Sequence, residues 1–128
     1  MVTSGFMQRL QQQPSNPGGL AEKYQALLSA LIADGTVPKR VLDLCWERIC
    51  CIHGLIEQSG LTEPVTYDER IAIRAAEKMP YQHHDLTDAE IDQIRSAFGD
   101  QGCVALLTAL SFFDVSCRLD QTAKVVWS

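Results

Sequence analysis

The chain has 128 residues and a formal net charge of −5, from 11 basic and 16 acidic side chains. This length predicts one domain, and a hydrophobic share of 46% excludes a disordered chain. The acidic balance argues against nucleic acid or an anionic membrane as the main partner. The longest apolar stretches, 26–33 and 103–113, are too short to span a bilayer, and residues 1–13 lack the apolar core of a signal peptide. We therefore expect a cytoplasmic protein that does not insert in a membrane.

The first half of the chain predicts a flexible arm followed by two helices. Residues 1–19 are rich in Gln, Pro and Gly, which favours an N-terminal arm with at most a short helix over 6–12. Apolar residues recur at spacings of three and four over 20–34, and Gly35 is a natural stop. A second helix is predicted over 38–53, beginning at a proline and ending near a glycine. The helical pattern can resume after Gly54, over 55–59.

The second half predicts three more helices. Thr66 and Thr87 each precede a glutamate by three residues, which is the pattern of a capping box at a helix start. Pro80 is expected to stop the first of these helices and Gly99 the second. The last helix, over 101–119, is apolar on most sides and must be buried centrally or by another subunit. Only 124–127 has the composition of a strand, and it lacks a partner.

These patterns together predict an all-α fold of about five helices. The expected organisation is an arm over 1–19, a helical domain over 20–120 and a C-terminal tail over 121–128. The apolar last helix favours assembly into a homo-oligomer.

Several short patterns, taken in order, resemble the alkylhydroperoxidase D-like / carboxymuconolactone decarboxylase superfamily. Residues 37–54 contain a predicted helix that begins after Pro38, carries the acidic Asp43, has Arg48 five residues on, and ends in a His-Gly turn. The segments 68–70, 84–88 and 112–119 are similar to the C-terminal helices of that superfamily, which close on an aromatic run followed by an arginine. The resemblance covers about residues 20–120. It implies an all-α helical bundle that forms trimers or hexamers, with a pocket at a subunit junction.

The superfamily that the sequence resembles has two functional branches. The redox branch uses a Cys-x-x-Cys pair with a histidine and a glutamate, whereas the decarboxylase branch uses acid/base groups without a metal. In one alignment register the cysteine slots fall on Leu55 and Gln58 and the histidine slot near Thr62. In the other, His53 takes the histidine slot and Ile49 the second cysteine slot. The cysteine pair is broken in both registers, which implies a cofactor-free enzyme of the decarboxylase branch.

Acid/base residues are predicted on the helix over 38–53. Asp43 and Glu47 are four residues apart and share a helix face, where two neighbouring carboxylates acquire different pKa values and act as acid and base. His53 is the predicted proton relay. The alternative is that Arg40 and Arg48 neutralise these carboxylates as surface ion pairs.

Substrate binding is predicted at three other side chains. Arg48 and Arg118 are candidates to hold an anionic group, although Arg118 lies four residues after Asp114 and has a structural pairing as its alternative. Trp46 is the remaining substrate-binding candidate, with a place in the core or at a subunit contact as its alternative. We expect a small carboxylated or carbonyl substrate that is decarboxylated or isomerised.

The five cysteines provide a different hypothesis. An odd number without a signal peptide predicts reduced thiols, and Cys45, Cys103 and Cys117 lie among apolar neighbours, as small core residues do. Cys50 stands three residues before His53, so a thiolate–imidazolium pair would support a thiol-dependent peroxidase or disulfide reductase that uses Cys50 or Cys51. Adjacent helical side chains point about 100° apart, so both thiols cannot face one substrate. Two small core residues are the alternative for this pair.

Metal binding and a non-catalytic role complete the predictions. His83 and His84 form a doublet, but neighbouring loop residues rarely converge on a metal, so we expect no metal site. No cofactor motif is present in the sequence. A relative that serves only in assembly or ligand binding remains the third hypothesis beside the two enzymes.

Overall fold

The computed structural model describes residues 12, 17–56 and 64–126, and within these residues it is helical with no strand, which confirms the all-α prediction. A short 3-10 turn, Pro17–Gly19, precedes α2 (Leu20–Ala33) and α3 (Lys39–Ile52). Then follow α4 (Tyr67–Gln82), a second 3-10 turn, His83–Asp85, and α5 (Asp88–Val126). The predicted helix over 6–12 and most of the segment 55–59 lie outside the described residues.

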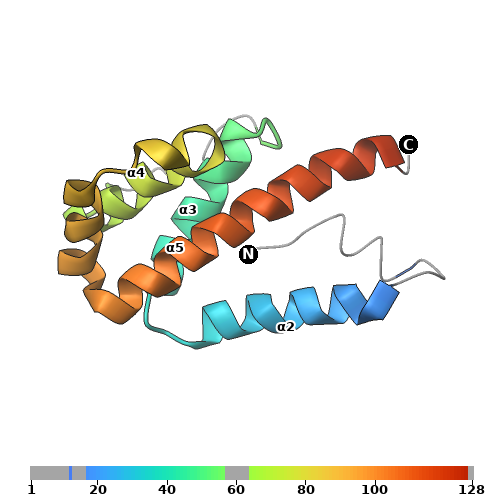
Figure 1. The fold of residues 1–128 in the computed structure, drawn as a ribbon, viewed down its shortest axis with the longest axis horizontal. Coiled ribbons are helices and arrows are strands. Elements are labelled where there is room, and N and C mark those ends of the chain that lie inside the picture. Colours follow the sequence, from blue (N-terminus) through green and yellow to red (C-terminus); the bar gives the residue numbers. More distant parts are fainter. Residues whose placement is uncertain (1–11, 13–16, 57–63, 127–128) are drawn as a thin grey trace.

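The long helix α5 contains a break at the position that the sequence predicts. Gly99 has φ 78° and ψ 174°, a conformation that is accessible to glycine and costly for other residues. Gly99 therefore separates the segments 88–98 and 100–126, as Figure 1 shows in orange and red. The second segment runs past the predicted end at 119, and Lys124–Val126 is helical rather than a strand. Continuing the helix pairs backbone groups that a lone strand would leave open.

Both predicted capping boxes are present. The Thr66 hydroxyl accepts from the Glu69 N–H at 3.2 Å, and the Glu69 carboxylate accepts from the Thr66 N–H at 2.8 Å. The same reciprocal pair joins Thr87 and Glu90 at 3.2 and 3.4 Å. These caps fix where α4 and α5 begin.

The prediction that Pro80 stops α4 is wrong, because α4 continues through Pro80 to Gln82. Pro80 lacks an N–H and so removes one helical hydrogen bond, but it lies in the last turn, where the helix has only two more residues to run. Its carbonyl accepts a hydrogen bond from Nη2 of Arg118 at 2.6 Å. This bond ties the end of α4 to α5.

The core forms where α3, α4 and α2 meet α5. Figure 1 shows α5 running between α2 and α4, with α3 crossing close to its middle. The Tyr24 hydroxyl of α2 donates to Ser116 of α5 at 2.7 Å. Large side chains that are almost fully buried line these contacts: Leu42, Ile49, Ile94, Leu106, Leu110 and Phe113. The central position of α5 explains why its sequence is apolar on most sides.

One stretch, Asp88–Ala123, is long and apolar enough for a membrane-spanning helix by length and composition alone. Its most apolar window has a mean hydropathy of 1.5, and 44% of that window is buried inside the fold. The core helices of soluble proteins share these features, and Gly99 interrupts this one.

Candidate functional site

The histidine predicted as a proton relay lies in the interior, between the end of α3 and the middle of α5. His53 caps α3, and Gly54, with φ 74°, reverses the chain after it. The His53 side chain is 1% exposed, and its Nε2 atom lies 2.6 Å from Oδ1 of Asp114. Gln121, two turns further along α5, donates a hydrogen bond to the His53 carbonyl. Backbone and ring of His53 are therefore both held by α5.

The bond to Asp114 determines which ring nitrogen of His53 is free. A carboxylate only accepts, so the short contact places a proton on Nε2. In the neutral ring Nδ1 then carries a lone pair, and within the described part of the chain this buried atom has no hydrogen-bond partner. Leaving a buried polar atom unpaired costs about 1–3 kcal/mol. Such an atom needs an explanation, and a role in proton transfer is one.

Arg118 completes a small polar network at this place. Its Nε donates to the second oxygen of Asp114 at 3.1 Å, which confirms the predicted Asp114–Arg118 pair. Its guanidinium carbon lies 5.4 Å from the centre of the Tyr81 ring. The Arg118 side chain is 49% exposed, whereas that of Asp114 is 16% exposed. We call His53, Asp114 and Arg118 the His53 cluster; it extends from a buried imidazole to a half-exposed cation.

A pair of thiols joins the same two helices. The sulfur atoms of Cys50 in α3 and Cys117 in α5 are 3.6 Å apart, and both residues are buried. The hydrogen bond from Cys117 lowers the pKa of Cys50, against burial and the charges of Asp120 and Glu47, which raise it. The same bond, together with burial, raises the pKa of Cys117. The two thiols therefore differ in acidity.

The remaining cysteines have other surroundings. Burial raises the pKa of Cys45 to about 12. Cys103 is also buried, so Cys45, Cys103 and Cys117 occupy the interior as predicted. Cys51 is partly exposed. All five are free thiols in the structure.

The structure places Asp43, one of the two carboxylates predicted for catalysis, far along α3 from His53. Asp43 and Glu47 are partly buried on α3. Ten residues of helix separate Asp43 from His53, a rise of about 15 Å. The carboxylate that contacts His53 is instead Asp114.

The other predicted residues of α3 contact neighbouring helices. Arg40 pairs with Glu69 at 2.6 Å and Arg48 with Glu77 at 3.2 Å, which joins α3 to α4. The ring of Trp46 packs edge-on against Phe113, with 5.4 Å between ring centres.

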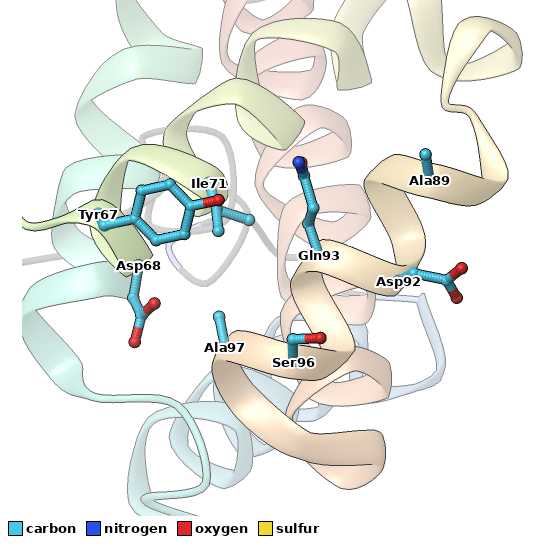
Figure 2. Close-up of a pocket in the computed structure, with 8 residues that line it drawn as sticks. All are labelled: Tyr67, Asp68, Ile71, Ala89, Asp92, Gln93, Ser96 and Ala97. Carbon is cyan, nitrogen blue, oxygen red and sulfur yellow. The ribbon is translucent and has the colours of Figure 1, made fainter.

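A cavity of about 510 Å³ opens between the start of α4 and the first segment of α5. In Figure 2 the Tyr67 ring and the Gln93 side chain lie between these two helices, with the carboxylates of Asp68 and Asp92 on either side. Asp92 also lies 3.7 Å from the guanidinium of Arg95. None of the predicted site residues lines this cavity.

The histidine doublet lies at the surface, where His83 and His84 are both exposed. Among the residues that the structure describes, no three His, Cys, Asp or Glu side chains are grouped so that they could hold a metal ion.

Sequence reasoning missed two partnerships: Asp114 with His53, and Cys117 with Cys50. A signal was present, because Asp114, Cys117 and Gln121 follow one another at three and four residues in an otherwise apolar helix. Such spacing places side chains on one helix face. Their partners are more than 60 residues away in sequence, and only the packing of α3 on α5 identifies them.

Comparison with known proteins adds no further constraint. The chain matches no protein-family model, no curated protein and no solved structure.

Proposed function

We propose that this protein is a cofactor-free acid/base enzyme, similar to the carboxymuconolactone decarboxylases, that decarboxylates or isomerises a small carboxylated or carbonyl compound. The observation that carries the proposal is the buried His53, held by Asp114 through Nε2 and left with a free Nδ1. The sequence resemblance over about residues 20–120 supports the same reaction class. In this proposal the protein is a cytoplasmic homo-oligomer.

His53 moves the proton, and Asp114 is its positioning residue. Asp114 fixes the tautomer and stabilises the imidazolium that forms when Nδ1 accepts a proton. In an isomerisation, Nδ1 takes a proton from one carbon beside a carbonyl and returns it to another. In a decarboxylation, Nδ1 first takes the proton of the substrate carboxylic acid. The bond from carbon to carboxylate then breaks, carbon dioxide leaves, the electron pair enters an enolate, and the imidazolium gives its proton to that carbon.

Substrate recognition would fall to the half-exposed end of the cluster. Arg118 retains exposed surface while bound to Asp114, so it can also approach a carboxylate of the substrate. Arg48 and Trp46 are further binding candidates on α3.

Asp43 requires a second subunit in this proposal. Asp43 lies about 15 Å along α3 from His53, a span that a small molecule cannot bridge. It reaches the same substrate only if α3 of a neighbouring subunit supplies it, together with Glu47 of that helix, which accords with the predicted pocket at a subunit junction.

The test is turnover of a panel of carboxylated lactones and β-keto acids, followed by release of carbon dioxide. We expect loss of turnover in His53→Gln and in the double variant Asp43→Asn/Glu47→Gln. In Asp114→Asn we expect a lower kcat and a shifted pH profile. Undiminished turnover in His53→Gln would refute the proposal, and undiminished turnover in the double variant would remove Asp43 and Glu47 from it.

The sequence offers thiol chemistry at Cys50 or Cys51 with His53 as the alternative. The contact between the sulfur atoms of Cys50 and Cys117 favours a form of it in which Cys50 is the reactive thiol and neither Cys51 nor His53 takes part.

A further inference from the structure

We propose that Cys50 and Cys117 form a dithiol site that reduces small hydroperoxides, with Cys50 as the attacking thiol and Cys117 as the resolving thiol. This inference rests on the thiol alternative, and it assigns Cys117, rather than the neighbouring Cys51, as the partner of Cys50. It does not depend on the acid/base proposal.

The distance between the two thiols favours bond formation. Their sulfur atoms are 3.6 Å apart, and a disulfide requires about 2 Å. The two cysteines belong to α3 and α5, which pack directly against each other. Closing the bond requires the two sulfur atoms to approach each other by side-chain rotation and local adjustment at this interface.

The two thiols are unequal, and the inequality assigns their roles. Cys50 is 6% exposed and Cys117 is fully buried, so an oxidant that enters from solvent meets Cys50 first. The hydrogen bond from Cys117 favours the Cys50 thiolate, which is the nucleophilic form, although Glu47 and Asp120 oppose it. Such limited exposure admits hydrogen peroxide or a small alkyl hydroperoxide rather than a protein disulfide.

The reaction balances over two displacements. The Cys50 thiolate attacks the terminal oxygen of the hydroperoxide, the O–O bond breaks, and the alkoxide takes a proton and leaves as an alcohol. Cys50 is then a sulfenic acid. The Cys117 sulfur attacks Cys50, the S–O bond breaks, and the hydroxide leaves as water with the proton of Cys117. Two thiols supply two electrons and become one disulfide, and a dithiol reductant restores them.

The other cysteines provide matched controls. Cys51 follows Cys50 on α3, so its side chain points about 100° away. Cys103 lies in α5 and is buried in the core. Replacing either with serine should leave the Cys50–Cys117 reaction intact.

The experiment treats the reduced full-length chain with hydrogen peroxide, alkylates the remaining thiols and maps tryptic peptides without reduction. We expect the intact mass to fall by two hydrogen atoms, with peptide 49–70 linked to peptide 96–118. Each peptide holds two cysteines, so the mapping is repeated in Cys51→Ser/Cys103→Ser, where the link should remain. In Cys117→Ser the link should disappear, and a sulfenic acid at Cys50 should be trapped by dimedone.

Three results would overturn the inference: native thiols that peroxide leaves unchanged, a link that disappears in Cys51→Ser/Cys103→Ser, or oxidation of Cys50 without a link to Cys117. The link is measured on the unsubstituted chain, so a Cys117→Ser variant that does not fold leaves the test valid. Repeating the mapping in His53→Gln separates this inference from the acid/base proposal, because that variant should lose turnover and keep the disulfide.

Discussion

The His53 cluster and the cavity beside Tyr67 differ in the chemical groups and in the space that they offer. The cluster brings a buried imidazole, a carboxylate and a cation together between α3 and α5. The cavity offers about 510 Å³ between α4 and the start of α5, but the polar and apolar residues that line it include no histidine or cysteine. Among the described residues, the His53 cluster and this cavity therefore lie in different parts of the fold.

This separation indicates how the proposed enzyme would be completed. The carboxylates of Asp68 and Asp92 in the cavity are open to water. His53 is buried with a fixed tautomer, which prepares it for proton transfer. Space for a substrate at the His53 cluster would be enclosed by a neighbouring subunit, as the resemblance implies. The two regions therefore predict different responses to mutation.

The largest expected effect is on turnover. His53→Gln should reduce kcat by about 100-fold or more, because general acid–base groups contribute on that scale. Asp92→Asn, in the cavity, is the matched control and should leave kcat unchanged. Steady-state kinetics on the carboxylated substrate panel measures both. If Asp92→Asn were the more damaging change, the cavity rather than the cluster would be the active site.

The next effect concerns stability around the cluster. Phe113 is 1% exposed and packs against Trp46, so Phe113→Ala should lower the free energy of unfolding by about 3–5 kcal/mol. Tyr67→Ala, at the 67% exposed Tyr67 of the cavity, should change it by less than about 0.5 kcal/mol. Urea denaturation followed by circular dichroism compares the two. Equal losses would mean that the cavity wall is as tightly packed as the core.

A smaller effect depends on pH and lies beside the cavity. The hydrogen bond from the Thr66 N–H, helped by Arg40 and opposed by burial, lowers the pKa of Glu69 below its ordinary value of 4.5. A lowered pKa in the folded state means that the stabilisation is present above the ordinary value and is lost as pH falls through the folded value. Glu69→Gln should therefore flatten the acid limb of stability against pH. An unchanged acid limb in that variant would show that Glu69 titrates alike in both states.

Local signals made much of the fold predictable. The Thr66 and Thr87 caps and the break at Gly99 act within a few residues, so sequence spacing alone reveals them. Pro80 misled the prediction because its effect depends on where the helix ends and on Arg118 from another helix. Likewise, 124–126 has strand-like residues, but it extends a helix that has already begun.

The site was predictable only in part. His53 stands out as a histidine at the end of an amphipathic helix, and Asp114–Arg118 follows from its four-residue spacing. The partners of His53 and Cys50 depend on how α3 crosses α5, which no local pattern encodes.

The tautomer of His53 is the most direct test of its proposed role in proton transfer. Long-range ¹H–¹⁵N correlation spectra of the native protein distinguish the two ring nitrogens, and His83 and His84, both exposed, can be assigned by their replacement with glutamine. Because Nε2 faces the Asp114 carboxylate, we expect the neutral His53 ring to carry its proton on Nε2 and to have a bare Nδ1, and we expect Asp114→Asn to alter this tautomer. A His53 ring with its proton on Nδ1 would contradict it.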